Sequence, residues 1–528
     1  MSFSFGFKLK MCLLRTFNHS IVRLNSTIYA LASGYGKCGV AVIRISGPKA
    51  CSSLFRMAGM KKYPVPRQAV LRKIEHPDTK ETLDHGLVIW FPGPRSFTGE
   101  NICELHVHGG VAVISSVLEA LGKMEDYRPA EAGEFTKRAF YGGKLDLLEV
   151  EGLGDLIDAD TDEQRKQALF QMEGALSKLY MDWRETLVKC VAHLEAFIDF
   201  SEEENIESGI LNQNHKAISE LLEGIKNHLA DGRRGERLRS GVKAVIIGEP
   251  NVGKSSLLNL LCQRQAAIVS PIPGTTRDIV ERPLNIQGFP VLVSDTAGLR
   301  TDTQDLIELE GVKRARECVA SADLYLLVAD AVEFSRNVLS KKFSVVEHLR
   351  SYIERLLLSD VLFQKGCKFK ATMEGYVKRE NSHLPNPVDT MGIRDNCLLI
   401  VNKRDLVEDF NHMDSIIQNF PNICFVSCKT NDGVMELMAK LKDQLSSLCA
   451  NPSQENPTIT QSRHRHHLQN CVISLESCLN LYEESEDCDV VMMVEHLRQA
   501  MRCLGKITGH VSTEEILDVI FSSFCIGK

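Results

Sequence analysis

The chain has 528 residues, a formal net charge of −7 at pH 7, 44% hydrophobic residues and 25% charged residues. This length predicts two to four domains, while the even spread of charges excludes a membrane-spanning helix and the acidic balance excludes coating of nucleic acid by bulk positive charge. The 17 cysteines include no C-x-x-C pair, which argues against a disulfide framework or a zinc ribbon and indicates a reducing compartment.

Residues 1–26 differ from the rest of the chain. They contain no Asp or Glu, and on a helical wheel Lys8, Arg15, His19 and Arg23 lie opposite the apolar side chains. The basic residues are Lys8, Lys10, Arg15 and Arg23. The segment resembles a mitochondrial transit peptide, which predicts a protein of the mitochondrial matrix whose folded part begins near Thr27. A disordered N-terminal tail is the alternative.

Residues 27–147 contain short apolar runs between turn residues. Val40–Ile45 and Gly86–Phe91 are predicted strands, and the apolar spacing of Val111–Leu121 predicts a helix. We therefore expect a small α+β domain here.

Apolar residues three and four positions apart predict long helices on both sides of a central segment. The first is an amphipathic helix over Leu169–Phe197, and others cover Leu468–Leu479 and Leu497–Leu504. The economical interpretation is an α/β domain at residues 240–450, inserted into a helical domain built from residues 148–239 and 451–528.

The inserted domain begins with a phosphate-binding loop. A buried-strand pattern, Lys243–Ile247, runs into Gly248–Ser255, which has the sequence G-x-x-x-x-G-K-S and precedes an apolar helix. Backbone N–H groups of such a loop turn toward phosphates, Lys254 adds a positive charge and the Ser255 hydroxyl binds Mg²⁺. The predicted contacts are Asn251, Val252, Gly253, Lys254, Ser255 and Ser256.

Two later loops predict that the base is guanine. A predicted strand ends in Asn402–Asp405, an N-K-R-D sequence, and the Asp405 carboxylate would accept both the N1 and N2 donors that adenine lacks together. We expect Asn402 to brace the loop and Lys403 to lie along the base. The backbone N–H groups that contact the guanine oxygen are assigned to Ser427, Cys428 and Lys429.

Two predicted switch segments lie between these motifs. The first is a D-T-A-G sequence at the end of a predicted strand, made of Asp295, Thr296, Ala297 and Gly298. Its aspartate would hold the Mg²⁺ shell, and its glycine N–H would contact the terminal phosphate. In Gly274–Asp278, Thr276 is the second candidate Mg²⁺ hydroxyl. Loss of the γ-phosphate would release both segments.

Leu299 occupies the position at which Ras-like GTPases have a water-orienting glutamine. Because leucine neither donates nor accepts a hydrogen bond, catalysis needs another polar group, and the acidic stretch Asp302–Glu310 is close in sequence. Asn251 in the phosphate loop also suggests a monovalent cation beside the phosphates, where it would stabilise the developing charge.

Three sequence blocks resemble the TrmE/MnmE family of tRNA-modifying GTPases, in particular its mitochondrial members. They are Gly39–Gly47 with Ser96–Leu105, Gly133–Phe140 with Gly143–Leu147, and the C-x-G-K ending Phe524–Lys528. The resemblance covers nearly everything after Thr27. It implies a multidomain α/β and α+β protein, in which a P-loop GTPase domain is inserted into a helical domain and preceded by a folate-binding α+β domain that forms a homodimer.

The resemblance also implies ligand contacts. A one-carbon donor, 5-formyl- or 5,10-methylene-tetrahydrofolate, would bind Arg44, Glu104, Lys144 and Lys528. Potassium would bind Asn251, Ser270, Thr275 and the backbone of Ile272. GTP and Mg²⁺ are the other ligands that the resemblance implies.

Two catalytic residues follow from the same resemblance. Glu308 aligns with the glutamate that orients the attacking water, and Glu310 is its rival because the alignment needs one extra residue after Gly298. Cys525 is the candidate nucleophile of the modification reaction, and the alternative is a thiol that packs or oxidises at a frayed end.

The implied function is modification of C5 of the wobble uridine, U34, in mitochondrial tRNAs. The protein would act with an FAD-binding MnmG-like partner, use the folate one-carbon unit and install a taurinomethyl-type group. The alternative, from another class, is a GTP-switched mitochondrial ribosome assembly factor of Era type. Such a factor would need an RNA-binding module such as a KH domain, and no GXXG loop of that type follows the GTPase segment.

Two histidine-containing clusters have open roles. His106 and His108 alternate as on one face of a strand and would suit a metal, although a structural role is favoured because no third ligand is evident. Arg463–His467 is a basic cluster that opens a predicted helix. It would either contact tRNA phosphates or form a solvated face.

The interval from Asp330 to Leu398 is longer than in a compact GTPase. Its part from Lys365 to Asp395 is polar and has little periodicity. We therefore predict an inserted surface loop near residues 333–395.

Overall fold

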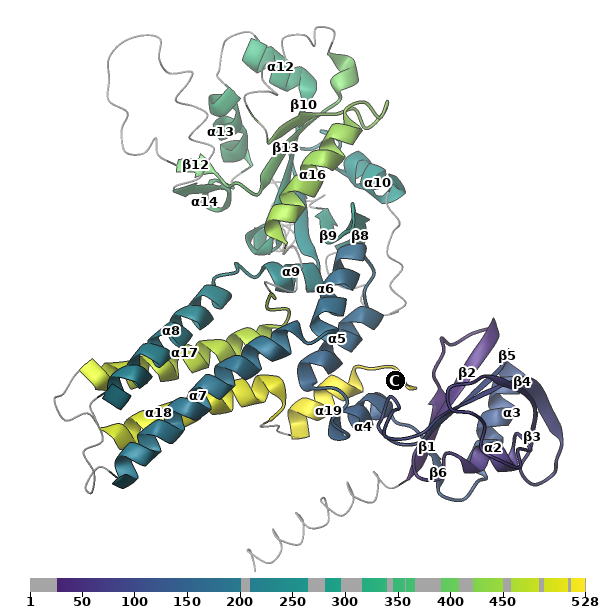
Figure 1. The fold of residues 1–528 in the computed structure, drawn as a ribbon. Helices are drawn as coiled ribbons and strands as arrows, with labels where there is room; N and C mark the ends of the chain where they lie inside the picture. The colour runs from purple at the N-terminus through teal and green to yellow at the C-terminus, as the bar shows by residue number, and fades with distance from the viewer. Residues whose placement is uncertain are drawn as a thin grey trace, which may run out of the picture. The chain divides into compact units, whose positions relative to one another are not determined.

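The structure is a computed structural model (Figure 1). It describes residues 26–200, 209–264, 281–295, 316–339, 345–356, 358–365, 391–407, 420, 422–449, 457–483, 489–510 and 514–527. The described residues form two compact units, one within residues 1–154, 171–221 and 470–528 and the other within residues 155–170 and 222–469. Both units mix sheets and helices, which confirms the predicted fold class.

The first unit contains a six-stranded sheet with the strand order β3-β4-β5-β2-β1-β6. The elements of this part are β1 (Thr27–Leu31), β2 (Cys38–Ser46), α2 (Ser52–Arg56), β3 (Val70–Glu75), β4 (Thr82–Phe91), β5 (Ile102–Gly109), α3 (Val111–Gly122), β6 (Tyr127–Pro129) and α4 (Glu134–Tyr141). Along β2 the buried Ala41, Ile43 and Ile45 alternate with the half-buried Val42 and Arg44. One face of the sheet therefore carries the apolar core, and the opposite, open face carries polar side chains such as Arg44 beside apolar ones such as Val42.

Helices form most of the chain at residues 147–240 and 462–522, on the two sides of residues 242–448. They are α5 (Leu147–Ile157), α6 (Asp162–Met172), α7 (Ala175–Phe200), α8 (Gly209–Leu229), α9 (Arg234–Ser240), α17 (Ser462–Glu483), α18 (Val490–Thr508) and α19 (Glu514–Ser522). Helix α18 packs along α7, and an ion pair of 2.7 Å joins Arg498 Nη2 to Glu195 Oε1. None of the described helices is long and apolar enough to cross a membrane.

The single helix predicted over Leu169–Phe197 is in fact two helices. Helix α6 ends at Met172, Gly174 has a φ of +83°, and α7 begins at Ala175. The apolar spacing continues through the break, so periodicity alone did not reveal it. The borders between the two units fall within α5, α6, α8 and α17, so that each unit contains helices from the predicted helical domain.

The second unit is built on a six-stranded sheet with the order β14-β13-β10-β7-β9-β8. Its elements are β7 (Val242–Ile247), α10 (Lys254–Arg264), β8 (Glu281–Ile286), β9 (Phe289–Asp295), β10 (Leu324–Asp330), α12 (Ala331–Leu339), α13 (Val345–Arg355), β13 (Cys397–Asn402), η3 (Arg404–Leu406), β14 (Ile423–Phe425) and α16 (Val434–Leu448). All neighbouring strands pair in parallel except β8, which is antiparallel to β9 at the edge. In such sheets ligands bind outside the carboxyl ends of the strands.

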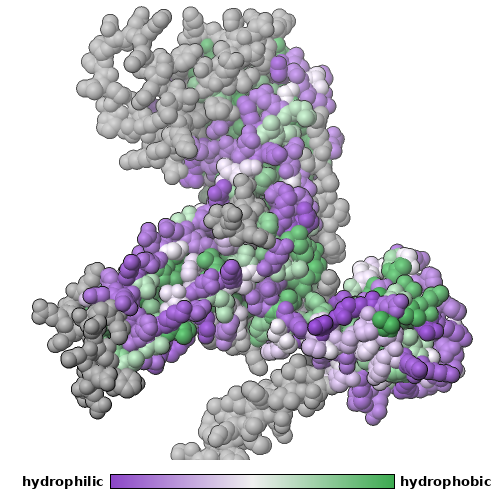
Figure 2. Space-filling view, in the orientation of Figure 1, coloured by the Kyte–Doolittle hydropathy of each residue, from purple (hydrophilic) through white to green (hydrophobic). Residues whose placement is uncertain are grey.

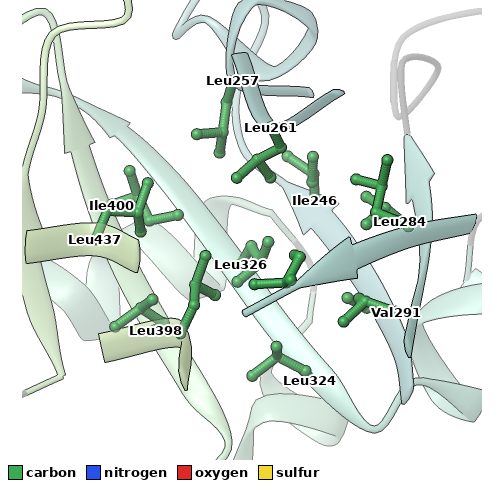
Figure 3. Packing of buried hydrophobic residues seen from close by; sticks show 14 of the residues in the cluster. Ile246, Leu257, Leu261, Leu284, Val291, Leu324, Leu326, Leu398, Ile400 and Leu437 are labelled. Carbon is green, nitrogen blue, oxygen red and sulfur yellow. The ribbon is translucent and has the colours of Figure 1, made fainter. Parts of the chain in front are cut away.

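Apolar side chains cover both faces of this sheet. On one face the strands pack with α10 and α16, and Figure 3 shows part of this core: Ile246, Leu257, Leu261, Leu326, Ile400 and Leu437. On the other face, alternate residues of the same strands pack with α12 and α13. The near-continuous apolar strands of the sequence are therefore central strands buried on two sides.

The inserted loop predicted near residues 333–395 requires correction. Helices α12 and α13 occupy its first part, and they are followed by α14 (Ser359–Leu362) and by the antiparallel pair β11 (Phe363–Lys365) and β12 (Met391–Ile393). Helix α13 contributes Leu349 and Ile353 to the core, which accounts for its apolar spacing. Residues 366–390 lie outside the described part of the chain.

Candidate active site

The phosphate loop, residues 248–255, links the end of β7 to the start of α10. Lys254 Nζ donates hydrogen bonds to the backbone oxygens of Gly248 and Glu249, at 2.9 and 2.8 Å. These bonds hold the lysine side chain across the loop. Asn251, at a φ of +64°, is exposed in the loop, as are Ser255 and Ser256 at the first turn of α10. The loop thus presents backbone N–H groups, hydroxyls and one ammonium, a set suited to phosphate and Mg²⁺.

Asn402 joins the phosphate loop to the two guanine loops. Its side chain is 3% exposed, and its Nδ2 donates to the backbone oxygen of Val252 at 2.9 Å. Its Oδ1 accepts from the backbone N–H of Cys428 at 3.2 Å. A Cβ on Gly253, which has a φ of +103°, would lie 2.1 Å from Asn402 Nδ2, so this close approach requires glycine. The bracing role predicted for Asn402 has this geometric basis.

Asp405 lies at the exposed end of the N-K-R-D loop. The hydroxyl of the buried Ser427 lies 2.6 Å from Asp405 Oδ1 and donates to it, which orients the carboxylate. Burial, together with the negative charge of Asp405, raises the pKa of the half-buried Cys428 thiol to about 11. The thiol therefore stays neutral at neutral pH, beside the predicted guanine position. Lys429 follows as an exposed residue of the same loop.

Lys403 is held by a residue that the sequence analysis missed. Its Nζ forms an ion pair of 2.8 Å with Asp330 Oδ2 at the end of β10. Burial would raise the pKa of Asp330, yet the hydrogen bond and charge of Lys403, together with the backbone N–H groups of Val332 and Glu333, outweigh burial and hold this pKa below its ordinary value. In the strand register Asp330 lies opposite Asn402, so a strand-end aspartate beside the guanine strand was the available signal.

The remaining predicted nucleotide contacts are not described by the structure. Asp295 ends β9, at the same sheet edge as the phosphate loop, and only its backbone is described. The others lie outside the described residues: Ser270, Ile272, Thr275, Thr276, Thr296, Ala297, Gly298 and Glu308, together with the rival Glu310. What the structure brings together are the loops that follow β7, β13 and β14, at the sheet edge where ligands bind in this architecture.

A second polar site lies on the open face of the N-terminal sheet. Arg44 Nε donates to Glu104 Oε1 at 3.0 Å across β2 and β5, and Glu104 Oε2 lies 3.2 Å from His106 Nε2. The Arg44 guanidinium also lies over the rings of Phe97 and Phe135, at 5.4 and 5.9 Å from their centroids. Burial would raise the pKa of Glu104, but His106 and Arg44 outweigh it, so the pKa lies below its ordinary value. Glu104 is therefore an anion held between two basic groups.

The C-terminal tail docks on the same N-terminal domain. Ile526 forms an isolated antiparallel bridge with Ala132. Gly527 has a φ of +102°, and a Cβ there would lie 2.0 Å from the backbone oxygen of Leu31, so the tail fits only because this residue is glycine. Cys525 is exposed. Lys144 is also exposed, while Lys528 lies outside the described residues.

The two histidine-containing clusters have structural partners. His108 Nδ1 lies 2.8 Å from Asp84 Oδ1, while His106 contacts Glu104 as described above. Among the described residues no group of three or more His, Cys, Asp or Glu side chains is placed to hold a metal ion. In the basic cluster, Arg465 forms ion pairs of 2.6 and 2.5 Å with Asp231 and Glu236. Arg465 is thus engaged by two carboxylates within the fold, and contact of this cluster with tRNA stays a prediction.

Two family models match this chain. The model described as GTP-binding protein TrmE N-terminus matches residues 27–144, and the model described as MnmE helical domain matches residues 147–525. Together they span almost all of the folded chain.

Whole-length relatives agree with these models. The chain is 50% identical over 509 residues to 5-taurinomethyluridine-tRNA synthase subunit GTPB3, mitochondrial, of Danio rerio, covering 96% of this chain and 93% of that protein. It is 44% identical over 519 residues to the Homo sapiens protein of the same name, covering 98% and 96%. It is 42% identical over 510 residues to tRNA modification GTPase MnmE of Maricaulis maris, covering 96% and 100%.

Mitochondrial localisation, which the N-terminal segment predicted, is confirmed by the eukaryotic relatives, whose names state it. The predicted GTPase activity in tRNA modification is confirmed by the relatives of Dictyostelium discoideum and Maricaulis maris, both of which are named tRNA modification GTPases. The two family models and the whole-length identity agree with the phosphate and guanine motifs. The chain therefore belongs to the TrmE/MnmE family of tRNA-modification GTPases.

Proposed function

We propose that this GTPase modifies C5 of the wobble uridine U34 in mitochondrial tRNAs, using a tetrahydrofolate one-carbon unit bound to its N-terminal domain. The product is a taurinomethyluridine, and an FAD-binding MnmG-like protein is the partner. One observation carries the proposal: the tail that contains Cys525 docks beside β1, whose Ala30 pairs with Arg44 of the polar site. A candidate nucleophile and a candidate ligand site therefore belong to one domain.

The polar site fits a folate in its chemistry. The pterin has an amide and an amino donor on one edge, which match the acceptor oxygens of Glu104. Phe97 is a half-buried aromatic ring beside Arg44, and Lys144 is an exposed cation that suits the glutamyl carboxylates, as would Lys528. When bound, the folate supplies the one-carbon unit. Arg44 and His106 keep Glu104 charged and oriented for the donor edge.

A homodimer through the N-terminal domain is supported by the apolar part of its open face. Leu71 and Leu87 pair across β3 and β4, and they are 67% and 41% exposed. Figure 2 shows hydrophobic residues gathered on the surface of this domain. A self-complementary interface between two copies of this domain would bury these paired, exposed leucines.

Nucleotide hydrolysis is proposed to need Mg²⁺, K⁺ and Glu308. Ser255 and Thr276 would bind Mg²⁺ with Asp295 behind them, and Asn251 would contribute to the K⁺ site together with Ser270, Ile272 and Thr275. Steady-state hydrolysis in matched K⁺ and Na⁺ buffers tests the cation. We expect a faster rate in K⁺ and no difference for Asn251→Ala, whereas equal rates in the unaltered protein would contradict the K⁺ site.

The Era-type alternative lacks a structural counterpart. In the described residues after α16, the chain forms α17, α18 and α19 and no further strand, whereas a KH module needs strands beside its GXXG loop. The matches to family models over residues 27–144 and 147–525 also favour tRNA modification.

Reconstitution tests the proposed function. The purified chain, the FAD-binding partner, a mitochondrial tRNA transcript, methylene-tetrahydrofolate, taurine and GTP should together yield taurinomethyluridine at U34, detected by mass spectrometry of nucleosides. Omission of the folate should abolish the product. Product formation without folate would contradict the assignment of the N-terminal site.

A further inference from the structure

A hydroxyl from α13 bridges the phosphate loop and β10. Tyr352 is 2% exposed, and its Oη donates to the backbone oxygen of Val328 at 2.6 Å. The same Oη accepts from the backbone N–H of Glu249 at 3.1 Å. One side chain thus satisfies a donor of the phosphate loop and an acceptor of the adjacent strand.

The bridge lies where the β7–β10 ladder stops. The last paired residues are Ile247 and Leu327, after which the chain leaves the sheet as the phosphate loop. The next residue, Pro250, has no N–H, so the Glu249 N–H is the last backbone donor in the first turn of the loop. The Tyr352 hydroxyl thus extends the connection beyond the ladder, to Val328 on one side and to Glu249 on the other. Burial raises the pKa of Tyr352, which keeps this hydroxyl protonated and able to donate.

Arg355 holds the same loop residue one helical turn further along α13. Its Nε forms an ion pair of 3.0 Å with Glu249 Oε1, and its Nη2 forms one of 2.8 Å with Glu333 of α12. The Glu249 backbone oxygen in turn accepts from Lys254. Glu249 is therefore held at its N–H by Tyr352, at its carboxylate by Arg355 and at its carbonyl by the phosphate-binding lysine.

We infer that Tyr352 and Arg355 are positioning residues of the GTP site, which hold the first turn of the phosphate loop in its nucleotide-binding conformation through Glu249. A phosphate loop binds because its N–H groups already converge before the nucleotide arrives. Without the bridge, the Glu249 N–H and the Val328 carbonyl lose their shared partner, and the loop gains alternatives that do not bind phosphate. The predicted consequence is faster nucleotide release.

The test is mant-GDP dissociation from the full-length protein, measured by stopped-flow chase with unlabelled GDP. We expect Tyr352→Phe to raise the dissociation rate by about tenfold and to change kcat at saturating GTP by a smaller factor, so that KM for GTP rises more than kcat falls. Tyr325→Phe is the matched control. Tyr325 is also fully buried and lies within β10, but its hydroxyl has no hydrogen-bond partner among the described residues.

The control separates positioning from general effects of removing a buried hydroxyl. Equal dissociation rates in Tyr352→Phe and Tyr325→Phe would overturn the inference. If Tyr352→Phe does not fold, Arg355→Met and Glu249→Gln provide the second test. Each single variant should raise the mant-GDP dissociation rate by only about two- to threefold, because the ion pair between the two side chains is partly exposed. The double variant should dissociate little faster than either single variant. Unchanged dissociation in both single variants would also overturn it.

Discussion

The nucleotide site and the N-terminal site are assembled in different ways. Each nucleotide-binding loop is a short motif that directly follows a strand, so the parallel sheet brings the loops to one edge. The N-terminal site is assembled across strands: Arg44 and Glu104 are 60 residues apart, and the C-terminal tail reaches the same domain from the far end of the sequence. Local sequence motifs are thus almost sufficient to locate the nucleotide site. The residues of the N-terminal site come together only in the folded protein.

The largest expected effect tests the motif-built site. Asp405→Asn should weaken GTP binding by about 10³-fold, because the two guanine donors lose their carboxylate acceptor. Fluorescence titration with mant-GTP measures it. Xanthosine triphosphate, which has a carbonyl in place of the guanine amino group, should bind the variant better than GTP does. Unchanged GTP affinity in the Asp405→Asn variant would contradict the assignment of Asp405 to guanine.

The next effect separates hydrolysis from binding. Glu308→Ala should lower the single-turnover rate of GTP hydrolysis in K⁺ by about 10²-fold, the scale of one positioned catalytic group, and leave mant-GTP affinity intact. Glu310→Ala is the control and should hydrolyse normally. The reverse pattern would mean that the loop alignment after Gly298 is off by two residues, and normal rates in both variants would refute the carboxylate mechanism.

A third prediction addresses the assembled site through its tail. Gly527→Val should displace the tail, because a Cβ there meets the Leu31 oxygen at 2.0 Å. We expect tRNA modification in the reconstituted assay to fall at least about tenfold, the scale of misplacing a reacting group. GTP hydrolysis should persist.

Gly36→Ala is the matched control for the tail. Gly36 also has a positive φ, +126°, but its Cβ would meet nothing within 4 Å. Gly36→Ala introduces backbone strain but no steric clash, so the rate of tRNA modification should stay near normal in this variant. If both variants modify tRNA equally well, docking of the tail does not matter for the reaction.

The smallest effect concerns stability and pH. Glu104→Gln should destabilise the protein by about 1–2 kcal/mol at neutral pH, the scale of a hydrogen bond to a charged group. Because the folded-state pKa of Glu104 lies below its ordinary value of 4.5, the ion pair contributes fully above pH 4.5 and its contribution is lost as pH falls through the folded pKa. Urea unfolding at neutral and acidic pH should show the difference between the two proteins shrinking on acidification. A difference that grows instead would contradict the assigned charge.

Much of the molecule was predictable where local sequence determines local structure. The P-loop, the N-K-R-D loop and the parallel strands that precede them carry their own turn chemistry, and the fold class followed from their order. The break at Gly174 was missed because α6 and α7 continue one apolar period. Helices α12 and α13 fall within the predicted loop because the polar stretch that follows them hides their apolar spacing.

The contacts that sequence could not predict join residues far apart in the chain. Tyr352 reaches the phosphate loop from α13, and Asp330 reaches Lys403 from a neighbouring strand. Neither belongs to a motif, and each depends on strand order and helix placement. Their roles are to position motif residues, and such roles appear only once the fold is known.

The central claim is that this GTPase serves wobble-uridine modification in mitochondria. Mass spectrometry of mitochondrial tRNA from cells that lack the protein tests it most directly. The account predicts that taurinomethyluridine at U34 disappears, returns with the unaltered chain and does not return with Asp405→Asn. Normal levels of the modified uridine in cells without the protein would contradict it.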